Sequence, residues 1–133
     1  MKRIKFKSFK RESGELTPIS FKNNFPFKVK RVFIIDGNKN YTRGDHAHYK
    51  CSQFLFPIIG RMKVDLISIE GKKKLILNSK KKEGYLIKPK TWCKISFLTK
   101  TAILLVVCDM EYKFNDYIED YEKFLKIIKK NNS

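Results

Sequence analysis

The chain has 133 residues, which is enough for one domain with a single buried core. Apolar residues make up 42% of the chain and its net charge is +17, a composition that excludes an intrinsically disordered chain. Lysine outnumbers arginine and is spread along the whole chain, which favours a solvated basic surface over a nucleic-acid interface. The same charge would attract an anionic small molecule.

The sequence indicates a cytoplasmic protein with no membrane partner. The longest apolar run, residues 102–108, is too short to span a bilayer as a helix. The N-terminal residues alternate lysine with apolar side chains and lack the apolar core of a signal peptide. Cys51, Cys93 and Cys108 are scattered without CxxC spacing, which favours reduced thiols in a reducing compartment.

Short β-rich runs separated by turn residues account for most of the chain. In chain order they are 29–35, with a turn expected at 36–38, then 53–59, 62–69, 74–77, 84–87, 94–98 and 102–108. Strands about ten residues apart are typical of an all-β sandwich or barrel. No linker interrupts the series, so residues 1–133 are expected to form one domain.

Only the C-terminus has helical periodicity, and we expect a helix over residues 116–130. Asp116 is the expected N-cap, with Glu119 as its capping-box partner. The apolar side chains that then share one face are Tyr117, Tyr121, Phe124, Leu125 and Ile128. Such a face usually packs on the domain that carries it.

The two histidines of the chain lie two residues apart in segment 43–48, RGDHAH. Residues i and i+2 of a strand point to the same side, so both imidazoles face one space. A pair of imidazoles on one strand face, beside Arg43, favours function over a structural role. His46 and His48 are therefore the candidate catalytic residues.

The spacing around this pair resembles the first cupin motif, in which HxH precedes a metal-binding glutamate and a later glycine. Gln53 stands at the glutamate position, and Gly60 closes the motif. The second motif maps to residues 89–94, where Lys94 replaces the last metal-binding histidine. A divalent metal would lose its only anionic ligand and meet a cation. We therefore expect no metal, and histidines that act as general acid and base.

Further segments extend the resemblance over nearly the whole chain. They are 14–16 (GEL), 27–33 (FKVKRVF), 43–48 (RGDHAH), Gln53, Trp92 and 116–121 (DYIEDY). With these residues the chain resembles the WxcM-like sugar 3,4-ketoisomerases, metal-independent cupins that act on dTDP-4-keto-6-deoxyglucose. The resemblance implies an all-β, cupin-type double-stranded β-helix (jelly roll) with a C-terminal α-helix.

The resemblance also implies the partners of the protein. A dTDP-linked keto-sugar would bind in each barrel, without a cofactor, nucleic acid or membrane. The protein would be a homodimer with swapped N-terminal strands, in which residues 1–20 cross to the partner subunit. Two positions depart from the family pattern: Ile34 stands where relatives often have tyrosine, and Ser13 where they have arginine.

The implied reaction moves a ketone from C4 to C3 and yields a dTDP-3-keto-6-deoxyhexose, for a 3-amino-3,6-dideoxyhexose of surface glycans. A base removes the acidic C3 proton, an enediol(ate) forms, and an acid protonates C4. His46 and His48 would share these transfers. Arg43, Tyr41 and Gln53 would polarise substrate oxygens.

Other side chains are candidates for binding the nucleotide. Arg31 and Lys94 are assigned to the diphosphate, with an exposed surface role as the alternative for each. Trp92 would either stack on thymine or belong to the core. Tyr112 and Tyr117 are expected to close the barrel mouth or pack on the helix.

Three other functions remain open on the sequence alone. A dTDP-sugar 3,5-epimerase shares the substrate, but it typically pairs one histidine with a tyrosine. A non-catalytic cupin that binds a sugar nucleotide or RNA would use the same cavity or the lysines. A metal-dependent cupin is the third alternative.

Overall fold

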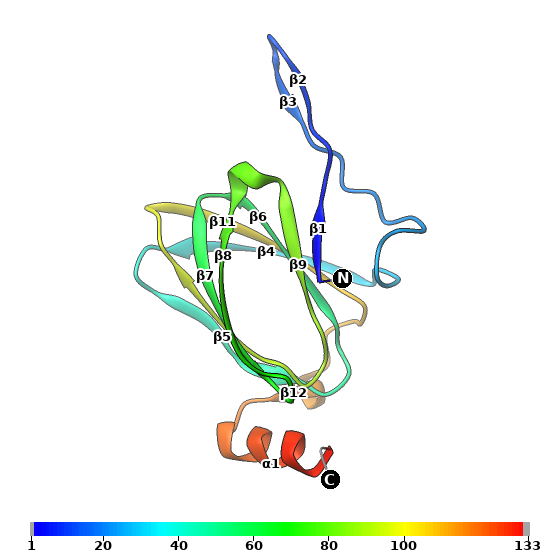
Figure 1. Ribbon diagram of the computed structural model, residues 1–133, viewed down its shortest axis with the longest axis vertical. Coiled ribbons are helices and arrows are strands. Elements are labelled where there is room, and N and C mark those ends of the chain that lie inside the picture. The colour runs from blue at the N-terminus through cyan, green and yellow to red at the C-terminus, as the bar shows by residue number, and fades with distance from the viewer. Residues whose placement is uncertain (1, 132–133) are drawn as a thin grey trace.

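The chain folds into two facing antiparallel sheets with a helix at one end (Figure 1). The computed structural model describes residues 2–131. Its elements are β1 (Arg3–Lys5), β2 (Phe9–Arg11), β3 (Gly14–Leu16), β4 (Arg31–Asn38), β5 (Thr42–His48), β6 (Gln53–Ile59), β7 (Arg61–Ser68), β8 (Gly71–Asn78), a 3₁₀ turn (Ser79–Lys81), β9 (Glu83–Ile87), β10 (Trp92–Phe97), β11 (Thr101–Cys108), a second 3₁₀ turn (Phe114–Asp116), β12 (Tyr117–Ile118) and α1 (Tyr121–Asn131).

The strand order is that of a jelly roll. One sheet has the order β1-β9-β6-β11-β4, and the other has the order β12-β5-β10-β7-β8. Strands distant in sequence are neighbours in both sheets, and every pair is antiparallel. The all-β jelly roll with a C-terminal helix predicted from the sequence is confirmed.

The main core lies between the two sheets because alternate side chains of each strand point inward. Met62, Val64 and Leu66 of β7 face this core, and Leu104 and Val106 of β11 meet them from the other sheet. Most of these side chains are less than 2% exposed. The alternation that predicted the strands therefore also closes the barrel.

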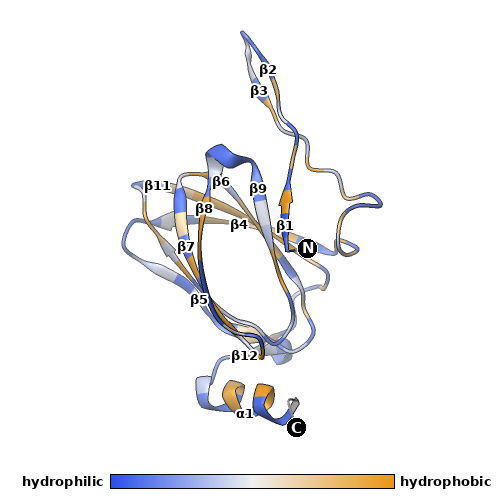
Figure 2. Cartoon of the chain, viewed as in Figure 1, coloured by the Kyte–Doolittle hydropathy of each residue, from blue (hydrophilic) through white to orange (hydrophobic). Residues whose placement is uncertain are grey.

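Two further layers cover the outer faces of the sheets. Helix α1 packs Phe124 against Trp92 and Ala47, which lie outside the barrel on β10 and β5. Figure 2 colours part of α1 orange, which marks the apolar residues it contributes to this layer. On the other sheet, Phe54 and Phe56 of β6 are covered by residues near the N-terminus.

Strand β4 is longer than predicted and continues through the expected turn at 36–38. These residues pair with Thr101, Ala102 and Ile103 of β11. Gly37 is required for packing: a Cβ at this position would lie 2.4 Å from the ring of Phe97. The chain turns later, at Asn40, which has a φ of 72°.

The helix was predicted to start at Asp116, but it begins at Tyr121. Asp120 is the N-cap, because its Oδ1 accepts the backbone N–H of Lys123 at 3.2 Å and its carbonyl accepts that of Phe124 at 2.9 Å. Asp116 lies in a 3₁₀ turn before β12. Its carboxylate binds elsewhere, as described below, and is not available as a cap.

The hairpin of β2 and β3 projects from the body of the molecule (Figure 1). Its strands pair only with each other, and Phe9 and Leu16 are 48% and 66% exposed. Within residues 2–131, no helical segment has the length and apolar content that a membrane crossing requires.

Candidate active site

A cavity opens between the two sheets at the end of β5. Leu55, Ile95 and Val106 supply part of its apolar wall. Its polar lining is concentrated on a few strands and the turns that follow them. The polar lining residues are Arg43, His46, His48, Cys51, Gln53, Lys88, Thr91, Cys93 and Tyr117. A mainly apolar cavity with a few convergent polar groups is the usual form of a small-molecule site.

A bulge in β5 sets the direction of the histidines. Gly44 and Asp45 both have left-handed backbones, with φ of 80° and 62°, and the register against β10 shifts between Cys93 and Lys94. A Cβ at Gly44 would lie 2.9 Å from the Cys93 carbonyl oxygen, so only glycine fits this close approach. Trp92 Nε1 donates to Asp45 Oδ1 at 2.9 Å and anchors the bulge.

The histidine strand has two faces with different uses. His46 and His48 line the cavity, as predicted from their spacing, while Ala47 between them packs beneath helix α1. The regular alternation of β10, which pairs with β7 without a register shift, decides which of its residues enter the cavity. Cys93 lines it, whereas Lys94 faces outward and lines a surface groove. The assignment of Lys94 to the position of the last metal-binding histidine is therefore wrong by one residue.

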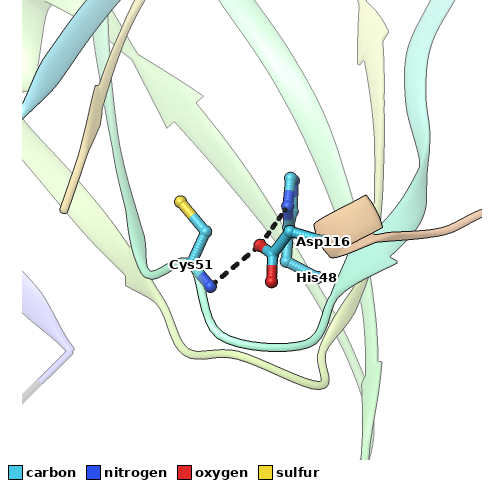
Figure 3. Close-up of side chains that lie close together, drawn as sticks. All are labelled: His48, Cys51 and Asp116. Atoms are coloured by element: carbon cyan, nitrogen blue, oxygen red, sulfur yellow. Dashed lines mark hydrogen bonds and ion pairs between the residues drawn. The ribbon is translucent and has the colours of Figure 1, made fainter. Parts of the chain in front are cut away.

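His48 is held in one orientation by Asp116. His48 Nδ1 lies 3.2 Å from Asp116 Oδ2, and both side chains are buried (Figure 3). Asp116 also accepts the backbone N–H groups of Lys50 at 2.8 Å and Cys51 at 3.1 Å. A carboxylate is an acceptor, so His48 Nδ1 carries the proton. Nε2 then has a free lone pair, and this buried atom has no hydrogen-bond partner within residues 2–131.

Both imidazoles are held in the neutral form near pH 7. Burial lowers the pKa of His46 and is also the largest cause of the lowered pKa of His48. The neighbouring His46 lowers the pKa of His48 further, and the hydrogen bond to Asp116 opposes the shift. The ring centroids lie 5.1 Å apart, so one substrate molecule can contact both rings.

Tyr117 completes this wall of the cavity. Its ring centroid lies 4.4 Å from that of His48 and 4.8 Å from that of His46. Burial raises the pKa of the phenol, so Tyr117 stays protonated and able to donate a hydrogen bond. Of the two roles predicted for Tyr117, packing on the helix is wrong, because its ring lies against the imidazoles in the cavity lining. Its position follows from β12, which pairs Tyr117 with His48.

Asp116 and Tyr117 are the functional residues that sequence reasoning missed. Both belong to the DYIEDY segment, which carried the family resemblance but was interpreted as the start of a helix. The signal was therefore present, and its structural interpretation was wrong. Lys88 and Thr91 were also missed, although they follow β9 closely and line the cavity.

Two of the predicted binding residues line the cavity and four do not. Arg43 and Gln53 line it. Tyr41 is 70% exposed and lies outside the cavity lining. Trp92 is buried beneath α1. Of the two roles predicted for it, the structure therefore has the core role and not stacking on thymine.

The remaining two predicted cations also lie outside the lining. Arg31 is absent from the lining, and its Nη2 is 3.5 Å from Cys108 Sγ. Its guanidinium lies over the rings of Phe33 and Tyr112. Lys94 faces outward because side chains alternate along β10. The structure therefore supports neither Arg31 nor Lys94 as a residue that binds the diphosphate inside the cavity.

One group of three side chains has the donor types of a metal site. Ligand atoms of His48, Cys51 and Asp116 lie within 4.8 Å of one another (Figure 3). The oxygens of Asp116 already accept two backbone N–H groups and face His48 Nδ1. These hydrogen bonds account for the proximity of the three groups. That the site works without metal remains a prediction.

An antiparallel jelly roll with two histidines of one strand in its cavity is a cupin-type fold with a candidate acid–base site. The family model described as FdtA, WxcM-like, C-terminal, matches residues 1–129. A TDP-4-oxo-6-deoxy-α-D-glucose-3,4-oxoisomerase of Aneurinibacillus thermoaerophilus is 32% identical over 97% of this chain and 93% of its own. The chain therefore belongs to the WxcM-like, C-terminal family.

Solved structures agree with this membership. The 3,4-ketoisomerase QdtA of Thermoanaerobacterium thermosaccharolyticum, a histidine-to-asparagine mutant in complex with TDP-4-keto-6-deoxyglucose, superposes with a TM-score of 0.89. It is 35% identical, over 96% of this chain and 93% of its own. WlaRA of Campylobacter jejuni, a TDP-fucose-3,4-ketoisomerase, has a TM-score of 0.84 and 30% identity, over 95% and 93% of the two chains.

Proposed function

We propose that this protein is a sugar 3,4-ketoisomerase that converts TDP-4-keto-6-deoxyglucose into a TDP-3-keto-6-deoxyhexose. The observation that carries the proposal is the unpartnered Nε2 of His48, fixed by Asp116 at Nδ1 and turned to a cavity that also holds His46. Family membership supplies the substrate class, because the similar enzymes are 3,4-ketoisomerases of TDP-sugars.

The reaction needs proton carriers that are neutral near pH 7, and both histidines meet this requirement. A neutral imidazole removes the C3 proton, which the C4 ketone acidifies, and the enediolate forms. The hydroxyl proton of O3 passes to O4, and the imidazolium produced, or its neighbour, returns a proton to C4, so that C3 becomes the ketone. No electron leaves the sugar, so the transfer requires no redox cofactor.

Donors around the histidines stabilise the enediolate oxygens. Gln53 and Arg43 line the cavity, and the Tyr117 phenol lies against both imidazole rings. Hydrogen bonds that strengthen as charge develops on an oxygen lower the activation barrier for this step. Lys88 is the other cation of the cavity lining, and we assign it to the diphosphate end of the substrate.

We further propose a homodimer in which the β2–β3 hairpin crosses to a partner subunit. The predicted crossing segment, residues 1–20, is too long, because β1 pairs with β9 of its own subunit. The β2–β3 hairpin has no other strand to pair with in its own subunit, and Phe9 and Leu16 are largely exposed. Strand β4 is an edge strand with Val32 and Ile34 exposed to solvent at 47% and 64%. Apolar edges of this kind are usually covered.

The dimer is tested by light scattering after size exclusion. The wild-type protein should have the mass of two chains, and Leu16→Lys should shift the population toward one chain. A monomeric wild-type protein would contradict the proposal.

We place the reaction in the cytoplasm, within the biosynthesis of a 3-amino-3,6-dideoxyhexose for surface glycans. The three cysteines are free, as expected of a reducing compartment. A 3-keto sugar is the substrate that an aminotransferase would require for amination at C3.

The test of function is incubation with TDP-4-keto-6-deoxyglucose in D₂O, followed by NMR. A 3-keto product with deuterium at C4 supports the proposal, whereas label at C5 would identify a 3,5-epimerase. Unchanged substrate would indicate a binding protein. Replacing His48 or His46 with asparagine should slow turnover by about 10²–10⁴-fold. Stoichiometric iron, nickel or zinc in the active protein would overturn the expectation of a metal-free site.

A further inference from the structure

Two side-chain donors converge on the sulfur of Cys108. Cys108 ends β11 and pairs in register with Arg31 of β4 on one side and Gln53 of β6 on the other. Residues opposite one another in neighbouring strands share a sheet face, so all three side chains point the same way. Arg31 Nη2 lies 3.5 Å from Cys108 Sγ, and Gln53 Nε2 lies 3.6 Å from it.

A second thiol lies beside this sulfur. Ser52 and Asp109 hold their two strands together, because Ser52 N donates to Asp109 Oδ1 at 2.8 Å and Asp109 N donates to the Ser52 carbonyl at 3.3 Å. The residues just before them are Cys51 and Cys108, two buried thiols of one core cluster that interact with each other, and the Cys51 thiol also donates to the Ser52 carbonyl at 3.4 Å. Cys51 lines the active-site cavity, and the proposed isomerase mechanism uses neither sulfur.

The surroundings of the pair favour a single negative charge. The hydrogen bond from the Cys51 thiol lowers the pKa of Cys108, and contacts with Arg31 and Gln53 lower it further. The same hydrogen bond is the largest cause of the raised pKa of Cys51. The two sulfurs therefore share one proton, with a nearby guanidinium to balance the charge.

The third cysteine provides an internal comparison. Cys93 also lines the cavity, but burial raises its pKa to about 12. It lacks the cationic neighbour that stabilises a thiolate at Cys108. A protonated thiol reacts slowly with oxidants, so Cys93 and Cys108 should differ sharply in reactivity.

We propose that Cys51 and Cys108 form a redox-active dithiol in the wall of the active site, which hydrogen peroxide or a similar small peroxide converts to a disulfide that inactivates the enzyme. The loss of activity rests on the proposed function, whereas formation of the disulfide does not.

The oxidation balances in two steps. The Cys108 thiolate attacks one oxygen of the peroxide. The O–O bond breaks, Cys108 becomes a sulfenic acid, and the hydroxide released takes the proton of Cys51 to form water. The Cys51 thiolate then attacks the sulfur of the sulfenic acid, so that the S–S bond forms and hydroxide leaves. The two sulfurs lose two electrons and the peroxide gains them.

The disulfide would disturb the catalytic wall at two points. The backbone N–H of Cys51 donates to Asp116, which in turn orients His48. The sulfur of Cys108 accepts from Gln53, whose side chain lines the cavity. Drawing the two sulfurs to bonding distance therefore strains both supports of the substrate site.

The test treats the full-length reduced protein with hydrogen peroxide and counts thiols after denaturation. The count should fall from three to one, since the chain has 3 cysteines. Peptide mapping without reductant should identify one linked pair, Cys51 with Cys108. Activity should fall in parallel and return with dithiothreitol.

Matched variants separate the dithiol from general oxidation. Cys93→Ala should keep the reversible inactivation, and Cys108→Ser should lose both the linked peptides and the recovery with dithiothreitol. The mapping of wild-type protein decides the question even if Cys108→Ser does not fold. Three remaining thiols after inactivation, modification at Cys93 alone, or a mapped disulfide with unchanged turnover would each overturn the proposal. An untreated protein without isomerase activity that still forms the disulfide would count against the proposed function alone.

Discussion

The orientation of His48 depends on a carboxylate 68 residues away in the chain. Asp116 fixes the proton on Nδ1, so that Nε2 presents its lone pair to the cavity. Asp116→Asn removes the charge but keeps one acceptor oxygen. We expect kcat to fall by about 10- to 100-fold, less than the 10²–10⁴-fold contribution of acid–base catalysis itself.

The pH profile separates this positioning role from a loss of folding. Asp116 opposes the lowered pKa of His48, so removing its charge should lower that pKa further. The acid limb of kcat should therefore move to lower pH in Asp116→Asn. Thermal unfolding of the variant serves as the control. An unchanged acid limb together with reduced activity would mean that Asp116 only supports the backbone of Lys50 and Cys51.

Two lysines that are close in the sequence should differ in their effect on substrate binding. Lys88 lines the cavity, whereas Lys94 lies outside it. A hydrogen bond to a charged group contributes about 1.5–3 kcal/mol, so Lys88→Ala should raise KM by about 10- to 100-fold with little change in kcat. Lys94→Ala is the matched control and should change KM less than about twofold. A larger rise in KM for Lys94→Ala than for Lys88→Ala would instead support Lys94 as the diphosphate ligand.

Among the elements, helix α1 supports the histidine strand from outside the barrel. Phe124 and Trp92 pack against Ala47, which lies between the two catalytic histidines. Asp120 caps this helix, and Asp120→Ala should lower the free energy of unfolding by about 1 kcal/mol.

Urea denaturation followed by circular dichroism measures the change. Glu119→Ala is the control, because this exposed residue was the capping partner in the sequence interpretation and caps nothing in the structure. It should change stability by less than about 0.5 kcal/mol. Equal losses in both variants would contradict the assignment of the cap.

Much of the fold could be predicted because the side chains of its strands alternate between the core and the outer face. Residues 53–59 were placed without error, and most other strands differ by only a few residues at their ends. A turn was wrongly predicted at residues 36–38, because glycine is common in turns, whereas Gly37 here makes room for the ring of Phe97. Tertiary contact, not local preference, decides such a position.

The site was partly predictable for the same reason. The i, i+2 spacing correctly placed His46 and His48 in one cavity. The bulge at Gly44 and Asp45 could not be deduced from spacing, and Lys94 lies outside the cavity because β10 turns Cys93 and Ile95 inward. Asp116 is brought to His48 only by the pairing of β12 with β5. This pairing joins distant parts of the chain and could not be predicted from a local sequence pattern.

At the scale of the whole molecule, the buried histidines link stability to pH. Their pKa values in the folded protein lie below the ordinary value of 6.5. In the unfolded chain both take up protons near that value, while the folded protein still holds them neutral. The unfolded state therefore binds more protons in this window, and the free energy of unfolding falls as pH falls below 6.5.

Denaturation from about pH 7.5 to about pH 5.5, at constant ionic strength of about 0.15 M, measures this dependence. Constant salt is needed because the net charge of +17 adds a self-repulsion that salt screens. The wild-type protein should lose stability steadily below pH 6.5, the ordinary pKa of both groups. The double variant His46→Asn/His48→Asn removes both groups and should have a flatter profile. Equal slopes in the two proteins would show that other groups carry the dependence and that the two imidazoles are not held neutral by burial.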